Sequence, residues 1–158
     1  GWIYDLARTE PGVDLVLYGG GVDQDKATGN IHAMGYVDSD TLIAGAEGDY
    51  GVVWYGSSLY EGAGSLGEYL KYNAPHKTSL YLRAGLPVII WDKAALAEIV
   101  SRLDIGICVS SLRGLGDAFR CQSGALRTNA RQCRSCSRET VERRFCQRSA
   151  FECEKDSV

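Results

Sequence analysis

The sequence has 158 residues, about the length of one ordinary domain, and it is 45% hydrophobic and 23% charged. This composition excludes a wholly disordered chain, and no apolar run approaches the roughly 18 residues of a membrane span, so we do not expect an integral membrane protein. The net charge of −3 gives no reason to expect a nucleic acid as partner.

Charge and cysteine content divide the chain into two unequal parts. Residues 1–120 contain 9 basic and 15 acidic side chains, whereas residues 121–158 contain 8 basic and 5 acidic ones. Five of the six cysteines also lie in the second part. We therefore expect one domain over residues 1–116, followed by an irregular tail rich in Cys and Arg over residues 117–158.

Short apolar runs alternate with turn residues along the first part. In chain order, the pattern predicts a helix at 2–7, strands at 13–18 and 30–37, a helix at 40–46, a strand at 50–55, helices at 65–72 and 75–84, a strand at 86–91, a helix at 93–103 and a strand at 105–109. The first six residues lack the basic stretch and the long apolar stretch of a signal peptide, and they already show the apolar pattern of the predicted helix at 2–7. We interpret this as a chain that begins in the middle of a fold.

Polar residues at the predicted helix ends support these boundaries. Asp38 or Ser39 suits the N-cap of the helix at 40–46, and Asp92 suits the N-cap of the helix at 93–103. Asn73 is a good N-cap for the helix at 75–84, whose first turn would hold Pro75.

The alternation of strands and helices predicts an α/β domain with a mainly parallel sheet. The strand at 86–91 is a continuous apolar run, as is typical of a strand covered on both faces. Ligands of such sheets bind beyond the carboxyl ends of the strands. The loops at 19–21, 56–64 and 73–77 are therefore the expected places for a site.

The start of the helix at 75–84 has the residues that an anion needs. Free backbone N–H groups and the helix dipole favour negative charge there, Lys77 adds a full positive charge and Ser79 adds a hydroxyl. A diphosphate would suit this arrangement. The alternative is a solvated helix terminus with Lys77 in water.

A longer motif surrounds this helix start. Tyr-Asn-Ala-Pro-His-Lys at 72–77 is followed by Ser-Leu-Tyr-Leu at 79–82, by Gly-Leu-Pro-Val-Ile at 85–89 and by Trp91. With Tyr-Gly-Gly-Gly at 18–21, this pattern closely resembles the C-terminal domain of glucosyltransferase 3-like enzymes and of the bacterial galactofuranosyltransferase-type proteins grouped with them. The resemblance covers roughly residues 1–116.

The resemblance implies a Rossmann-like parallel sheet, the donor-binding domain of a two-domain GT-B glycosyltransferase. Its ligand would be a nucleotide sugar, commonly a UDP-sugar, bound without a metal ion or other cofactor. The residues that it places at the donor diphosphate are Asn73, His76, Lys77, Ser79, Gly19 and Gly20. It does not assign a catalytic residue.

Three further side chains, Tyr55, Tyr72 and Glu68, have two interpretations each. Tyr55 or Tyr72 could stack on the nucleotide base, but ordinary packing at the end of a strand or helix explains them equally well. Glu68 fits a cleft carboxylate or a solvated helix face. We expect His32 on the surface of a strand.

Two features depart from the family. The resemblance places the first strand of the donor domain upstream of Gly1, which would leave strand edges unpaired. Residues 121–158 contain seven Arg and five Cys in place of the family's long helices. A frame shift near residues 117–121 is our interpretation of the tail, because shifting the frame by one base can give a peptide rich in helix formers. The alternatives are a zinc site around Cys133 and Cys136, disulfides, or a basic RNA-binding tail.

These observations predict the donor-binding half of a bacterial hexosyltransferase that builds cell-surface polysaccharide or glycoprotein glycan. The acceptor would be a glycan or a lipid-linked sugar. The enzyme would act in the cytoplasm, with peripheral association at the inner face of the membrane, and we expect little activity from this chain alone. The alternatives are a non-catalytic nucleotide-binding module and a degenerate gene product.

Overall fold

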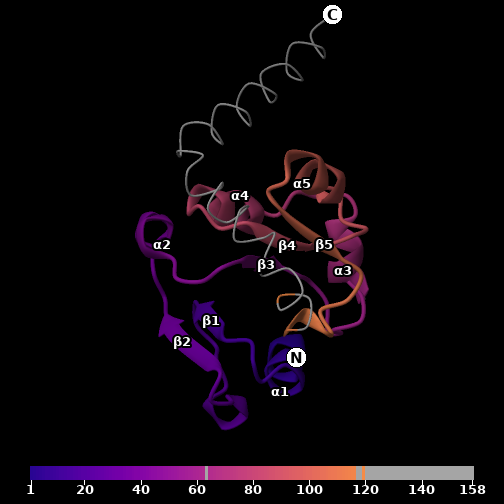
Figure 1. Cartoon of the computed structure of the whole chain (residues 1–158). Coiled ribbons are helices and arrows are strands. Elements are labelled where there is room, and N and C mark those ends of the chain that lie inside the picture. Colours follow the sequence, from indigo (N-terminus) through magenta and orange to yellow (C-terminus); the bar gives the residue numbers. More distant parts are fainter. Residues whose placement is uncertain (63, 117–118, 120–158) are drawn as a thin grey trace, which may run out of the picture.

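The computed structural model describes residues 1–62, 64–116 and 119, and every structural statement below concerns these residues. The elements are α1 (Trp2–Thr9), β1 (Leu15–Tyr18), the 3₁₀ helix η1 (Gln24–Lys26), β2 (Ile31–Gly35), α2 (Ser39–Gly45), β3 (Gly51–Val53), α3 (Gly64–Leu70), α4 (His76–Arg83), β4 (Val88–Trp91), α5 (Ala97–Leu103) and β5 (Gly106–Val109) (Figure 1). All five predicted strands and all five predicted helices are present, with bounds that differ by a few residues.

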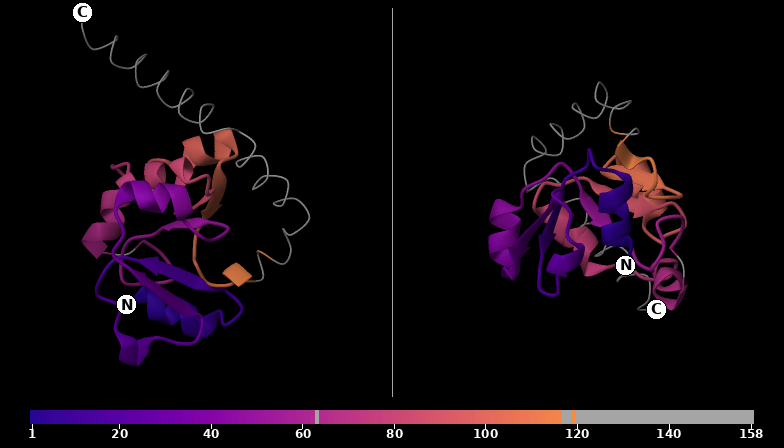
Figure 2. Two further views of the ribbon diagram at one scale, coloured as in Figure 1. Left: turned by 90° about the vertical axis from the view of Figure 1, so that its left-hand side faces the viewer. Right: turned by 90° about the horizontal axis from the view of Figure 1, so that it is seen from below.

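The described strands form two parallel sheets, which confirms the predicted α/β class and agrees with a Rossmann-like fold. One sheet has the order β1-β2 and the other the order β3-β4-β5. Leu15 is in register with Ile31 in the first sheet, and Gly51 with Val88 in the second. Figures 1 and 2 show α1 with the smaller sheet at one end of the molecule and α4 and α5 at the other.

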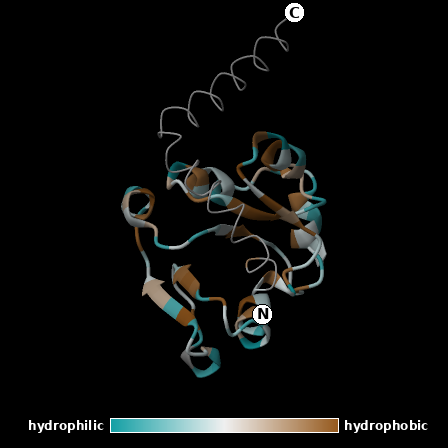
Figure 3. Cartoon of the chain, in the orientation of Figure 1, coloured by the Kyte–Doolittle hydropathy of each residue, from teal (hydrophilic) through white to brown (hydrophobic). Residues whose placement is uncertain are grey.

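The core is centred on β4. All four residues of this strand are buried, as its continuous apolar sequence predicts. Figure 3 shows β4 and β5 as predominantly hydrophobic. Leu6 of α1, Leu15 of β1 and Val53 of β3 belong to the same hydrophobic cluster as β4. One core therefore spans both sheets.

A glycine in β3 lets α4 approach the sheet closely. A Cβ atom added to Gly51 would lie 2.2 Å from Cγ of Tyr81, a residue of α4, and real Cβ atoms do not come that near. Glycine is therefore the residue that allows this helix to pack directly on the strand. This contact sets the position of the α4 N-terminus relative to the carboxyl end of β3.

One predicted helix cap is confirmed. The Asp38 side chain accepts hydrogen bonds from the backbone N–H groups of Asp40 and Thr41 and caps α2. The Thr41 hydroxyl, the largest influence, holds the pKa of the Asp38 carboxyl below its ordinary value.

The predicted caps of α4 and α5 are wrong. Pro75, with extended backbone (φ −65°, ψ 136°), is the N-cap of α4, and the Asn73 side chain donates to the carbonyl of Tyr69. The helix α5 begins at Ala97 instead of residue 93, and the N–H of Ala95, which a cap at Asp92 would bond, donates to the carbonyl of Leu70. Both corrections come from contacts with α3.

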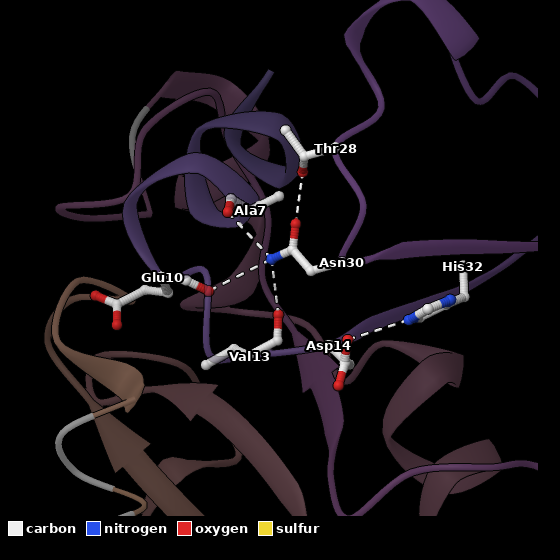
Figure 4. A network of polar contacts seen from close by, with 7 residues as sticks. All are labelled: Ala7, Glu10, Val13, Asp14, Thr28, Asn30 and His32. Carbon is white, nitrogen blue, oxygen red and sulfur yellow. Dashed lines mark hydrogen bonds and ion pairs between the residues drawn. The ribbon is translucent and has the colours of Figure 1, made fainter.

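A polar network joins the end of α1 to the smaller sheet (Figure 4). The side-chain amide of Asn30 donates to the carbonyls of Ala7, Glu10 and Val13, and its oxygen accepts from the hydroxyl of Thr28. The bond to Ala7 satisfies a carbonyl that the end of a helix leaves without a partner, and the bonds to Glu10 and Val13 tie the segment after α1 to the start of β2. None of the described helices combines the length and the apolar character that a membrane crossing requires.

Candidate functional site

The start of α4 lies beside the segment that follows β3. Lys77 is exposed, and its Nζ lies 5.5 Å from the centroid of the Tyr55 ring. Tyr55 comes two residues after Val53, the last residue of β3. The predicted helix start therefore lies at the carboxyl end of a parallel strand, where ligands of α/β sheets bind.

The first turn of α4 presents unpaired N–H groups. The N–H of Thr78 donates to the Pro75 carbonyl at 2.9 Å, whereas the N–H groups of His76 and Lys77 have no partner among the described residues. The first turn contains no acidic side chain. The His76 side chain is exposed. Two amides, the helix dipole and one ammonium group thus give this corner a positive potential that suits an anion.

Ser79 and Asn73 contribute less than the sequence predicts. The Ser79 hydroxyl donates to the His76 carbonyl at 2.9 Å, so its hydrogen is used inside the helix and its oxygen is left as an acceptor. The Asn73 amide is exposed and donates to Tyr69. A diphosphate needs donors; the single O–H of Ser79 is engaged, whereas the Asn73 amide uses one of its two N–H groups.

The two candidate tyrosines have different surroundings. Tyr55 is half-buried, lies under Lys77 and packs against Tyr69 with ring centroids 6.4 Å apart. Tyr72 is 79% exposed and has no ring partner within the described segments. The structure therefore places the Tyr55 ring beside Lys77 at the start of α4 and leaves the Tyr72 ring exposed.

Gly19 and Gly20 lie in the loop that follows β1, at the smaller sheet. Gly19 has a positive φ of 121°, and a Cβ at either residue would meet no described atom within 4 Å. The loop is open, as close approach by a ligand requires. His32 is exposed on the surface of β2 and pairs with Asp14 (Figure 4). Glu68 is exposed on α3 and pairs with Lys71.

Sequence analysis missed two features near this corner. The Thr78 side chain is buried, and its Oγ1 has no hydrogen-bond partner in the part of the chain that the structure describes. The helical spacing of Thr78 and Leu82, which are both buried, is the signal that could have shown this. At the end of β4, Lys71 and Lys93 lie 5.6 Å and 5.8 Å from the Trp91 ring. No sequence pattern predicts that second cationic group, since Lys71 lies directly after α3, far from Trp91 in the sequence.

The family model described as "Glucosyltransferase 3-like, C-terminal domain" matches residues 1–152. The chain belongs to this family. The match confirms the resemblance and extends past residue 116, the end of the range over which the sequence predicts it.

The zinc, disulfide, RNA-binding and frame-shift interpretations of the tail lie outside the described residues. Within those residues, no group of three or more His, Cys, Asp or Glu side chains could hold a metal ion.

Two curated relatives of the family are bacterial glycosyltransferases. The chain is 52% identical over 64 residues to the beta-1,6-galactofuranosyltransferase WbbI of Escherichia coli K12, and this match covers 40% of the chain and 19% of the relative. It is 29% identical over 91 residues to glucosyltransferase 3 of Streptococcus gordonii, which covers 57% of the chain and 26% of the relative. The matches thus span about a fifth and a quarter of these relatives. No solved structure matches the chain.

Proposed function

We propose that this chain is the donor-binding part of a hexosyltransferase, and that the α4 N-terminus with Lys77 binds the diphosphate of a nucleotide sugar, most simply a UDP-sugar. The observation that carries the proposal is the position of the Lys77 ammonium group, exposed over Tyr55 at the carboxyl end of β3. The family and its two named glycosyltransferases support the reaction class.

The chemistry follows from where charge develops. In glycosyl transfer, the bond between the anomeric carbon and the diphosphate oxygen breaks while a hydroxyl of the acceptor forms the new bond. Negative charge grows on the leaving diphosphate. The N–H groups of His76 and Lys77 and the Lys77 ammonium group would stabilise that charge without reorganising, which is the most effective electrostatic contribution that a site makes. In this proposal the protein's own cation and amides hold the diphosphate, so no metal ion is needed.

We extend the proposal to the acceptor and the setting. The acceptor would be a sugar of a cell-surface polysaccharide or glycoprotein glycan, on a lipid carrier or on protein, and the support for a glycan acceptor is that both named relatives are bacterial glycosyltransferases. The reaction would take place in the cytoplasm, at the inner face of the membrane.

Calorimetric titration of the full chain with UDP tests the site. Removing a charge-assisted contact costs about 1.5–3 kcal/mol, so we expect Lys77→Ala to weaken UDP binding by about tenfold or more. Lys26→Ala is the matched control, because Lys26 is also an exposed lysine but belongs to η1 and pairs with Asp23. It should leave UDP affinity unchanged, and EDTA should leave the affinity of the unaltered chain unchanged.

Two results would contradict the proposal. Equal UDP affinity in the unaltered chain and in Lys77→Ala would remove Lys77 from the site. Loss of binding on adding EDTA, restored by a divalent cation, would show that a metal ion holds the diphosphate instead. Thermal melts of both variants, run alongside, identify any loss that comes from unfolding.

A further inference from the structure

The loop after β3 crosses the carboxyl end of the larger sheet. Strands β3, β4 and β5 are parallel and paired in register, so all three end at one edge. The Leu59 carbonyl accepts hydrogen bonds from the Ser111 hydroxyl at 3.0 Å and from the Leu112 N–H at 2.8 Å, and both donors follow β5. A Cβ atom at Gly62 would lie 2.7 Å from the Trp91 ring, at the end of β4. The loop therefore reaches from β3, past β4, to the segment after β5.

Further hydrogen bonds fix this loop from within. The indole N–H of Trp54 donates to the Ser58 carbonyl at 2.9 Å, and the Tyr60 N–H donates to the Ser58 hydroxyl oxygen at 3.0 Å. Trp54 and Leu59 are both buried. The backbone at Tyr60 is therefore held in one position relative to the sheet, although the residue belongs to a loop.

The Tyr60 side chain is exposed in spite of this rigid support. Tyr60 is 62% exposed, and its hydroxyl accepts a hydrogen bond from the Arg113 guanidinium group at 3.0 Å. The Cζ atom of Arg113 lies 5.7 Å from the centroid of the Tyr60 ring, and the Arg113 N–H donates to the Ser111 hydroxyl oxygen at 3.0 Å. Arg113 is itself exposed and forms no ion pair with a described residue. A fixed aromatic ring and a guanidinium group with donors to spare thus face solvent side by side.

A hexose ring matches the chemistry of this pair. A sugar ring has a face of C–H groups, which packs against the flat face of an aromatic ring, and a rim of hydroxyl oxygens, which accept hydrogen bonds from guanidinium N–H groups. Tyrosine makes such contacts at a low cost in conformational entropy because it has few rotatable bonds. Here the hydroxyl of Tyr60 is already bonded to Arg113, so a bound sugar has little left to order.

We propose that Tyr60 and Arg113 bind a neutral hexose residue of the acceptor glycan, whose ring stacks on Tyr60 and whose hydroxyls accept from Arg113. This inference rests on the proposed function, because a glycosyltransferase needs its acceptor sugar close to the bond that it forms. Lys77 lies beside the end of β3, and Arg113 follows β5 at the same edge of the sheet. The strand β4 lies between those two ends, so they are two strand spacings apart, roughly 10 Å, which leaves room for a sugar beside a diphosphate.

Titration of the full chain with methyl glycosides of glucose and galactose, followed by saturation-transfer NMR, tests this site. We expect Tyr60→Ala to weaken glycoside binding by about tenfold or more, because it removes the stacking surface. Tyr60→Phe keeps the ring and should weaken binding by less, and Arg113→Ala should weaken it severalfold. Tyr36→Ala is the matched control, because Tyr36 is an 86% exposed tyrosine that follows β2, in the smaller sheet, and it should leave binding unchanged.

Titrations with UDP separate this inference from the proposed function. Tyr60→Ala should leave UDP affinity unchanged, and Lys77→Ala should leave glycoside affinity unchanged. No binding of either glycoside, or equal glycoside affinity in the unaltered chain and in Tyr60→Ala, overturns the sugar site, whereas the diphosphate site is judged by the effect of Lys77→Ala on UDP.

Two further outcomes are decisive. Loss of UDP binding in Tyr60→Ala, with an unchanged melting temperature, assigns the ring to the nucleotide and overturns the sugar site. If Tyr60→Ala does not fold, Arg113→Ala is compared with Tyr36→Ala in its place, and equal glycoside affinity in those two variants overturns the sugar site.

Discussion

Neighbouring side chains at the start of α4 have opposite surroundings. Lys77 is exposed over Tyr55, whereas Thr78 is only 4% exposed and its hydroxyl has no partner among the described residues. Consecutive helix residues point about 100° apart, so one side chain faces the site while the next faces the sheet. A buried hydroxyl without a partner costs stability, because the group gives up its hydrogen bonds to water.

Replacing that hydroxyl should therefore stabilise the protein. Valine has the branched shape of threonine without the polar oxygen, and an unpaired buried group costs about 1–3 kcal/mol, so we expect Thr78→Val to raise the free energy of unfolding by about 1 kcal/mol. Urea denaturation measures this value. Ser79→Ala is the control, because the Ser79 hydroxyl is exposed and already bonded to His76. A less stable Thr78→Val variant would show that the hydroxyl has a partner in solution.

The position of α4 as an element depends on its packing against β3. The helix reaches the strand through Tyr81, whose ring occupies the space that a side chain at position 51 would need. Burial raises the pKa of the Tyr81 phenol, with a smaller contribution from Tyr55, so the hydroxyl stays neutral at physiological pH. The geometry at Lys77 thus depends on a glycine 26 positions earlier in the chain.

An alanine at position 51 should displace this helix. Its Cβ would lie 2.2 Å from Tyr81 Cγ, and overpacking of this kind costs about 1–3 kcal/mol, so we expect Gly51→Ala to lower the melting temperature and weaken UDP binding. Gly45→Ala, near the end of α2, is the matched control because its Cβ would meet no described atom within 4 Å. Alanine is favoured over glycine in a helix, so that variant should be neutral or slightly more stable. Equal melting temperatures for the two variants would contradict the packing argument.

Local patterns predict the elements of this chain better than their ends. The apolar run of β4 and the cap at Asp38 are confirmed because each depends on a few consecutive residues. The predicted start of α5 is wrong, and the N–H of Ala95, which a cap at Asp92 would bond, donates instead to a carbonyl of α3. The candidate site shows the same contrast between what local sequence predicts and what packing decides. The motif identifies Lys77, but its contact with Tyr55 and the burial of Thr78 depend on how α4 packs on the sheet.

At the scale of the whole molecule, few described contacts hold the two sheets together. The shared core includes Leu6 and Ala7 of α1. A second connection is the Glu10 carboxylate at the end of α1, which accepts hydrogen bonds from the N–H groups of Gly114 at 2.6 Å and Gly116 at 3.2 Å. Those glycines follow β5, the last strand of the larger sheet. One side chain thus ties the α1 end of the fold to the segment after the last strand.

Removing the Glu10 carboxylate should loosen the smaller sheet first. Hydrogen bonds to a charged group contribute about 1.5–3 kcal/mol, so we expect Glu10→Ala to lower the free energy of unfolding by that amount and Glu10→Gln, which keeps one acceptor oxygen, by less. Glu98→Ala is the control, because Glu98 is exposed and its pair with Arg102 spans 3.9 Å, so this variant should change stability little.

Hydrogen exchange in the Glu10→Ala variant should accelerate in segments 13–19 and 31–35 more than in β4, since β1 and β2 have no ladder to the larger sheet among the described residues. Uniform acceleration across both sheets would mean that the two halves unfold as one unit and that Glu10 stabilises them equally.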